Sequence, residues 1–354
     1  MSALDRNEEF SDPVFTRDRR SWWAGMDVPG VNVCTAERLT VKEAFDAYLP
    51  WEVRKVELID PEGITPAGIY VHKRSDTGAA LGSSTDRFTV IQNSDVEELL
   101  TGALWGADYA VASIGALKHG AITFCSVDFD DMPDINVAGQ KILPFLSLVN
   151  PHDGHGSLRA YGTGIRPECL NTINLGWLAG TRLGRLSHTT NVMSRIPELQ
   201  RTIQAYLDLV PKAETVVGRL INAKLGAADL SRAIDMMTPI PEARMKDGKV
   251  KNAAAITRAE ARRDEIRTLA LSDDRVGYTG TAWGLFQAFS TYEQHEKGFR
   301  RTATSGVESR QGATLVEHFT GKQETNDSKL MARVLRFADV TGVKVTAAGL
   351  VAVG

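Results

Sequence analysis

The apolar residues of this 354-residue chain change their spacing near residue 169, and that change restricts the folds that the chain can adopt. Before it, short β-branched or apolar runs alternate with turns that contain Gly, Ser and Asp, a pattern typical of strands and hairpins. After it, apolar residues recur at helical spacing. This order predicts an α+β protein with a mainly antiparallel β-sheet in its N-terminal half, packed by helices from the C-terminal half.

The first half contains one predicted hairpin, one predicted helix and further strands. Lys118-His-Gly120 is turn chemistry between two apolar runs and therefore predicts a hairpin. Ser94 and Glu97 have the spacing of a capping box, which predicts a helix that continues through Leu100. The predicted strands cover residues 67–73, 87–91, 109–117, 121–129 and 141–149.

The second half contains several predicted helices. In the longest of them, Pro211 is expected to kink the helix or to divide it in two, because proline lacks a backbone donor. The aromatic residues from Trp283 to Tyr292 recur every three residues, which favours a core or subunit contact over base stacking. The predicted helices cover residues 169–183, 194–225, 252–271 and 281–298; a flexible linker is expected at 239–251 and a last strand at 342–353.

These patterns divide the chain into three parts. Residues 1–45 are expected to form an N-terminal arm that docks on the body or on a neighbouring subunit. Residues 46–300 form the predicted core domain, which is β-rich to about residue 168 and helical after it. Residues 301–354 are expected to form a mobile basic segment followed by a C-terminal helix and strand.

Composition excludes several classes of protein. The chain is 43% apolar with a net charge of −3, which is ordinary for a globular protein. No apolar run is long enough for a membrane helix, and the charged N-terminus has no apolar signal region, so a cytoplasmic protein without a membrane partner is expected. Three widely spaced cysteines indicate neither a disulfide framework nor a CxxC metal knuckle. No Walker A motif is present, which argues against an ATP-driven motor.

The charge is distributed unevenly. Between Leu158 and Arg201 there are six arginines and two glutamates, although the whole chain is acidic. Guanidinium groups bind phosphate through forked, charge-assisted hydrogen bonds, and hydroxyl groups add neutral donors. A solvated helix face with ion pairs explains the same pattern about equally well. The residues of the predicted phosphate-binding strip are Arg166, Arg182, Arg185, His188 and Thr189.

Further residues are candidates for the same strip. Asn171 offers an amide, although the capping of a helix start is the more frequent role of such a residue. Arg87 lies at the edge of a predicted strand, from where it can approach a phosphate. Arg300 and Arg301 belong to a second basic cluster, which either closes over nucleic acid or keeps the surface soluble.

A metal site is the main alternative. His152, Asp153 and His155 lie within four positions, and Cys169 or His188 would complete a ligand set. The surrounding Asn-Pro and Asp-Gly pairs are equally typical of a turn, which is the more frequent explanation of such a pattern. No nucleophile motif supports a hydrolase, so the chain is not expected to be an enzyme or to need a cofactor.

Several short motifs occur together in one order. They are Trp51, Arg74-Ser-Asp-Thr-Gly78, Leu81-Gly82, Arg87-Phe-Thr-Val-Ile-Gln-Asn93, Asn150-Pro-His-Asp-Gly-His-Gly-Ser157, Arg166-x-x-Cys169-x-Asn171-Thr172, His188-Thr189 and Gly280-Thr-Ala-Trp-Gly284. In these motifs the chain resembles the phage/plasmid-like protein family, catalogued as domain of unknown function 932, over roughly residues 50–295. It departs from the family pattern at Pro167 and at Gln287.

The resemblance implies a phage, prophage or plasmid setting and a place in the host bacterial cytosol. The β-then-α order is similar to that of the single-strand annealing recombinases, which is an analogy of fold only. The expected function is therefore binding and annealing of single-stranded DNA by a homo-oligomer without ATP. The alternatives are a metal-dependent nuclease or hydrolase centred on His152, Asp153 and His155, and a non-catalytic protein that binds a host factor.

Overall fold

The computed structural model describes most of the chain. The described residues are 14–17, 32–59, 68–129, 135–137, 140–165, 172–174, 184–208, 210, 213–246, 249–272, 276–298, 317, 322–338, 343–346 and 349–352.

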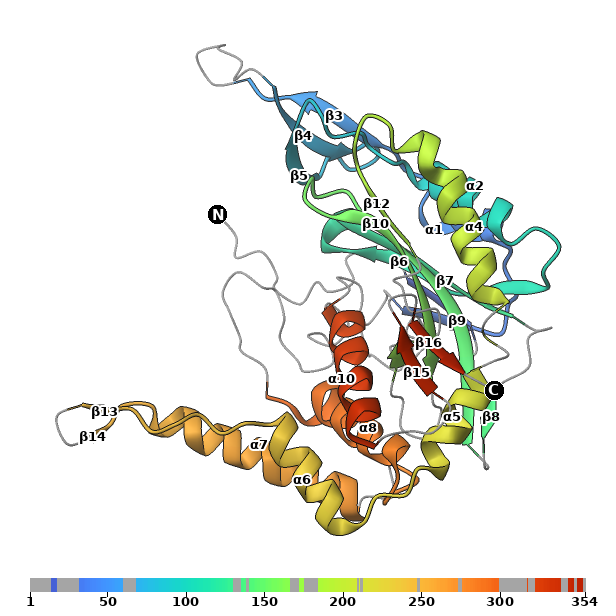
Figure 1. Cartoon of the computed structure of the whole chain (residues 1–354). Coiled ribbons are helices and arrows are strands. Elements are labelled where there is room, and N and C mark those ends of the chain that lie inside the picture. Colours follow the sequence, from blue (N-terminus) through green and yellow to red (C-terminus); the bar gives the residue numbers. More distant parts are fainter. Residues whose placement is uncertain are drawn as a thin grey trace.

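A nine-stranded sheet forms the centre of the molecule (Figure 1). Its main path runs β11-β10-β9-β7-β6-β1-β2, while β8 pairs with β9 and β12 pairs with β10. All pairs are antiparallel except β1 with β2. The strands are β1 (Val14–Arg17), β2 (Asn32–Thr35), β6 (Tyr109–Leu117), β7 (Ile122–Phe129), β8 (Ile135–Val137), β9 (Gln140–Pro151), β10 (Ser157–Ile165), β11 (Thr172–Asn174) and β12 (Gly184–Ser187).

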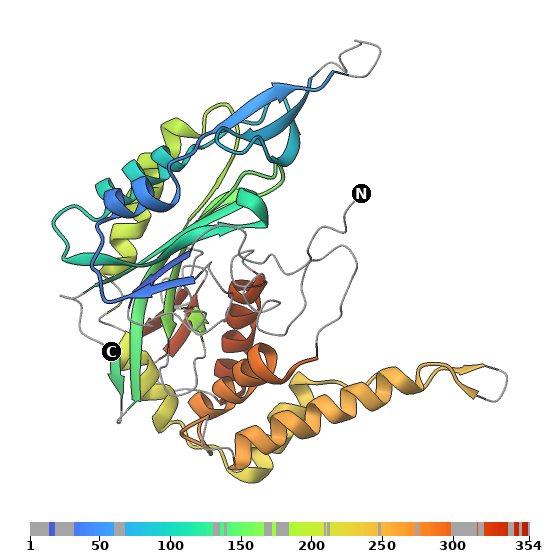
Figure 2. The ribbon, with the colours of Figure 1, turned by 180° about the vertical axis from the view of Figure 1, so that it is seen from behind.

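Helices cover both faces of this sheet. Every residue of β7 is buried, which explains why its sequence lacks the polar alternation of a one-sided strand. Helices α1 (Val41–Tyr48), α2 (Asn93–Ala103) and α4 (Ile196–Leu207) lie on one face. Helices α8 (Ala282–Thr291) and α10 (Lys322–Ala338) lie on the other, as both views show (Figures 1 and 2).

The core contains the aromatic stripe of α8. Trp283, Phe286 and Phe289 are all buried, as their spacing predicts. Thr281 caps this helix by accepting a hydrogen bond from the Gly284 amide at 3.0 Å. Because every residue of α8 is buried, this helix is the centre of the second half of the protein.

A smaller antiparallel sheet lies at one end of the large one. Its three strands are β3 (Val53–Glu57), β4 (Ile69–Arg74) and β5 (Ala80–Thr85), in the order β3-β4-β5. The side chain of Gln92 hydrogen-bonds both the amide and the carbonyl of Val53, at 2.9 and 3.0 Å, and so satisfies part of the free edge of β3.

The remaining elements extend from the helical half. Helix α5 (Ala213–Asn222) leads to α6 (Ala227–Met237), which packs against the 20-residue helix α7 (Ala253–Ser272). A short hairpin of β13 (Met245–Lys246) and β14 (Lys249–Val250) joins α6 to α7. It stands at the far end of α7, away from the body (Figures 1 and 2). A second hairpin, β15 (Val343–Thr346) and β16 (Gly349–Ala352), follows α10.

The predicted α+β class is confirmed, with antiparallel sheets mainly in the N-terminal part and helices mainly in the C-terminal part. The predicted division of the long helix is also confirmed, since α4 ends at Leu207 and α5 begins at Ala213; Pro211 itself lies outside the described residues. The predicted helix over 252–271 corresponds to α7, and that over 281–298 to α8 with the π-helical turn Tyr292–Glu296.

Other sequence predictions are wrong in part. Residues 87–91 are not a strand but the connection before α2, because Gln92 caps that helix through Asp95. Residues 172–174 are strand β11 and not helix; the rest of the predicted helix over 169–183 lies outside the described residues. The expected linker at 239–251 contains the β13–β14 hairpin, and the expected last strand is a hairpin.

Part of the predicted N-terminal arm belongs to the sheet. β1 pairs with β6, and Phe15 is completely buried. Arg17 forms a buried ion pair with Asp128 of β7. The division of the chain into arm, core and C-terminal segment stays a prediction. In the part of the chain that the structure describes, no helix is long and apolar enough to cross a membrane.

Candidate functional site

An open groove of about 480 Å³ lies where the small sheet meets the large one. Strand β5, the connection that follows it, the β9–β10 loop and the end of β12 contribute its walls, and β5 and β12 lie near each other in Figure 1. We call it the β5 groove. Its lining residues are Ile69, Ser83, Ser84, Thr85, Arg87, Phe88, Gly154, His155, His188 and Thr189.

Two glycines allow the walls of the β5 groove to meet. Gly154 has a φ of +86°, and a Cβ there would lie 2.1 Å from the carbonyl oxygen of Ser83. A Cβ on Gly82 would lie 2.1 Å from the carbonyl oxygen of Asp153. Only glycine permits this close approach of two backbones. The β9–β10 loop is therefore held directly against β5.

Aromatic rings form the inner wall. The ring of Phe88 stacks on His188, with centroids 4.4 Å apart and planes within 6°. His72 of β4 lies against Phe88, with a centroid distance of 4.7 Å and a tilt of 42°. Phe88 therefore has a histidine ring close by in addition to the stacked His188. We infer that its ring is used for packing and is a poor platform for a further stacked base.

Two hydrogen bonds to Thr89 fix the position of His188. Its backbone carbonyl accepts the amide hydrogen of Thr89 at 3.0 Å, and its Nδ1–H donates to the Thr89 carbonyl at 2.9 Å. Burial lowers the pKa of His188, so the ring is neutral at pH 7 with a lone pair on Nε2. Among the described residues, this buried Nε2 has no hydrogen-bond partner. A polar atom at the wall of a groove is thus left for a ligand or for water.

The rim of the β5 groove is polar and carries a cation. Ser83, Thr85 and Thr189 are exposed and offer hydroxyl groups, and the exposed Arg87 offers a guanidinium. Within the described residues, Arg87 takes part in no ion pair, and no carboxylate lines the groove. Hydroxyl and guanidinium donors without a carboxylate fit an anion, and phosphate in particular.

A buried hydrogen-bond network lies beneath the groove. His72 donates Nδ1–H to the carbonyl of His152 at 2.7 Å, and its Nε2 accepts the hydroxyl of Ser84 at 2.7 Å. His152 in turn donates Nε2–H to the amide oxygen of Asn93 at 3.2 Å. Complete burial lowers the pKa of His152 to about 3, so this ring stays neutral. The network fixes β4, β5 and the start of α2 to the end of β9.

These bonds give the metal alternative no support. His152 is buried, and its Nε2 is occupied by Asn93. Asp153 accepts the amide hydrogens of His155 and Gly156 through Oδ1, at 2.8 and 2.9 Å, and so shapes a turn. His155 is exposed at the groove. No group of three or more His, Cys, Asp or Glu side chains converges on a possible metal position in the described part of the chain.

Three of the predicted phosphate-binding residues meet in the β5 groove. Arg87 comes from the first half of the chain, whereas His188 and Thr189 follow β12. Arg185 lies on β12 but does not line the groove; its Nε donates to the hydroxyl of Ser157 at 3.0 Å. The other predicted residues lie outside the described residues: Arg166, Asn171, Arg182, Arg300 and Arg301.

The sequence does not single out the hydroxyl-bearing wall. Residues 83–85 are turn-forming residues by type, yet they belong to β5 and face the groove. Phe88 lies in a motif that carries the family resemblance, which is the one signal that could have identified it. His72 has no such signal, because only the pairing of β4 with β5 brings it to Ser84.

Comparison with known proteins gives one match. Residues 80–315 match the family model described as Domain of unknown function (DUF932). No curated protein and no solved structure matches the chain. The match covers two thirds of the chain and includes every residue that lines the β5 groove except Ile69.

Proposed function

The chain belongs to the family of domain of unknown function 932, and we propose that in this member the β5 groove binds the phosphate backbone of single-stranded DNA. The observation that carries the proposal is the lining of the groove. One guanidinium that forms no ion pair with another described residue and several hydroxyl groups face a common space that no described carboxylate lines. This set matches the donors that proteins use for phosphate and sugar contacts.

The same lining indicates where the bases of a bound strand would lie. Phe88 already packs against His188 and lies close to His72, so the groove has no open aromatic platform. A bound strand would be held through its backbone, and its base edges would stay in solvent. Such a strand is available for pairing, which is what annealing requires. The proposed activity is therefore ATP-independent annealing, in which the protein neither makes nor breaks a covalent bond.

Annealing on this surface also calls for more than one subunit. One groove of about 480 Å³ holds only a few nucleotides, and stable pairing needs a longer aligned strand. A homo-oligomer that places equivalent grooves in a row satisfies this need. We therefore include self-association, in the cytosol of a bacterial host, in the proposed function.

Fluorescence anisotropy of a labelled oligo-dT at low and at moderate salt tests the proposal. Wild-type protein should bind, and its affinity should fall steeply with salt. Arg87→Ala should weaken binding about tenfold for all sequences alike and should reduce the salt slope by about one. Arg201→Ala is the matched control, since Arg201 is an exposed arginine of α4 that does not line the groove.

Two outcomes would count against the groove. If wild-type protein does not bind at low salt, the function is not nucleic-acid binding, and a host factor becomes the partner to seek. If Arg87→Ala behaves as Arg201→Ala does, the strand binds elsewhere. Arg185→Ala separates the β5 groove from the wider strip predicted from the sequence, because Arg185 lies on β12 outside the groove.

A further inference from the structure

The connection between α6 and α7 is an exposed basic hairpin. From Glu242 to Arg258 the sequence has five basic and two acidic residues, in a chain with a net charge of −3. Arg244, Lys249 and Lys251 are exposed, and none of them forms an ion pair with another described residue. A local excess of unpaired positive charge on an acidic protein favours an anionic partner.

The same hairpin carries apolar side chains in solvent. Met245 is 63% exposed and Val250 is 39% exposed, and the two are cross-strand partners. Nucleic-acid-binding proteins combine cations that bind phosphates with apolar side chains that contact bases or sugars, and this hairpin offers both kinds of side chain. The apolar pair and the unpaired cations therefore lie together on one exposed hairpin.

The hairpin is anchored to the helix that bears it. Asn252 donates Nδ2–H to the carbonyl of Glu242 at 2.7 Å, and its Oδ1 accepts the amide hydrogen of Arg244 at 2.8 Å. The Lys251 amide donates to the Arg244 carbonyl at 2.8 Å, which extends the ladder by one pair. The orientation of the hairpin relative to α7 is therefore defined by hydrogen bonds.

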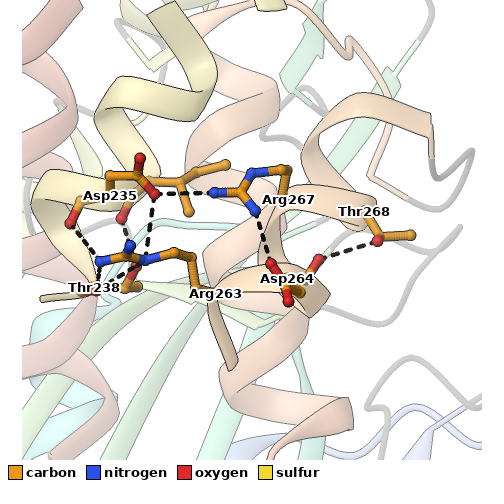
Figure 3. A network of polar contacts seen from close by, with 7 residues as sticks. Asp235, Thr238, Arg263, Asp264, Arg267 and Thr268 are labelled. Atoms are coloured by element: carbon orange, nitrogen blue, oxygen red, sulfur yellow. Dashed lines mark hydrogen bonds and ion pairs between the residues drawn. The ribbon is translucent and has the colours of Figure 1, made fainter. Parts of the chain in front are cut away.

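A second set of bonds joins α7 to α6 (Figure 3). Arg263 donates from Nη2 to the carbonyl of Thr238 at 2.7 Å, and so caps the C-terminal end of α6. Arg267 forms ion pairs with Asp235 of α6 at 3.0 Å and with Asp264 at 2.7 Å. Because α7 is 20 residues long, it spans about 30 Å, and its exposed half carries the hairpin away from the body (Figure 2).

We propose that the β13–β14 hairpin is a second contact for the nucleic-acid strand, in which Arg244, Lys249 and Lys251 bind phosphates and Met245 with Val250 contacts bases or sugars. This inference rests on the proposed function for the identity of the ligand, but it concerns different residues. A strand that reaches both the β5 groove and the hairpin is bound at two points. Two-point binding raises the affinity for long strands more than that for short ones.

The test measures the affinity of full-length protein for oligo-dT of about 10 and of about 60 nucleotides, lengths that cover about one site and several sites. The double variant Lys249→Ala/Lys251→Ala should bind the long strand about tenfold more weakly or worse, with a salt slope reduced by about two. Binding of the short strand should change less. The control Arg201→Ala/Lys329→Ala removes two exposed charges from α4 and α10 and should match wild type.

Met245→Ser tests the apolar contact separately. It removes no charge, so it should weaken binding of the long strand while leaving the salt slope unchanged. Because all substituted side chains are exposed, the melting temperature of each variant should equal that of wild type, which a thermal melt checks.

The outcomes separate this inference from the groove. If Arg87→Ala weakens binding and the hairpin variant matches its control, the hairpin inference is overturned and the groove stands. If only the hairpin variant weakens binding, the hairpin stands and the groove is excluded. If light scattering shows that the hairpin variant changes the subunit number while DNA binding is intact, the hairpin is a protein contact and the inference is wrong. If wild-type protein binds neither oligonucleotide, both the groove proposal and the hairpin inference are wrong.

Discussion

His152 is a titratable residue placed where it cannot hold a charge. It is buried beneath the β5 groove, and its pKa is lowered to about 3 from an ordinary value of 6.5. Burial also lowers the pKa of His72 and that of His188. All three rings are neutral in the folded protein at neutral pH, and they become protonated more readily in the unfolded chain.

The folded protein should therefore lose stability as the pH falls below 6.5. The unfolded chain binds more protons than the folded protein between the two pKa values, so the contribution of each histidine is complete above pH 6.5 and declines as the pH falls towards the folded pKa. For His152 the free energy of unfolding should drop by about 1.4 kcal/mol per pH unit. Urea denaturation at a series of pH values from 7 down to about 5.5, where most carboxylates are still ionised, measures this slope.

His152→Gln provides the comparison. The amide keeps a donor for Asn93 but does not titrate, so this variant should be less stable at pH 7 and should show a smaller slope between pH 6.5 and about 5.5. An unchanged slope in this variant would mean that other groups cause the acid sensitivity.

At the scale of elements, the β5 groove depends on the contact between β5 and the β9–β10 loop. These two segments are about seventy residues apart in the sequence, and the absence of a side chain at Gly82 and at Gly154 lets them touch. The groove is therefore a property of how two elements meet and not of either element alone.

Gly154→Ala should lower the free energy of unfolding by more than the unfavourable backbone conformation alone explains. The positive φ of +86° alone costs about 1–2 kcal/mol for alanine, and the new Cβ would also overlap the Ser83 carbonyl. Gly78→Ala is the matched control, because Gly78 has a φ of +71° but no atom within 4 Å of the added Cβ. Denaturation should rank Gly154→Ala as the more destabilised, and anisotropy should show weaker oligonucleotide binding for it alone. Equal losses of stability in the two variants would show that the β9–β10 loop accommodates the added Cβ without opening the groove.

At the scale of the whole molecule, the N-terminal strand is part of the large sheet. β1 lies between β6 and β2, and it is tied to β7 by the buried ion pair of Arg17 with Asp128. Strand β1 therefore contributes to the global stability of the protein, as any interior strand does.

Phe15→Ala should destabilise the whole protein. A completely buried phenylalanine contributes about 3–5 kcal/mol relative to alanine, through lost transfer energy and the cavity that remains. Val56→Ala on β3, where the side chain is 42% exposed, is the control and should cost less than about 1 kcal/mol. Urea denaturation followed by circular dichroism measures both. A similar, small loss in the two variants would mean that β1 detaches without unfolding the sheet.

The sequence by itself determined the helices and turns that depend on residues close together in the chain. Helical periodicity and the presence of a proline predict two helices where α4 and α5 are found, and the three-residue spacing from Trp283 places α8 in the core. The turn at Lys118-His-Gly120 joins β6 and β7 as predicted. Each of these features follows from contacts within a few turns of helix or one hairpin, which the local order of residues encodes.

Only the tertiary structure decided the site. Arg87 meets His188 and Thr189 about a hundred residues away because β12 pairs with β10 and the Thr89 backbone bonds His188. Arg185 has the same chemistry as Arg87 but lies outside the groove. Strand register and the meeting of two sheets decide which side chains share a space, and these result from many long-range contacts that no short pattern contains.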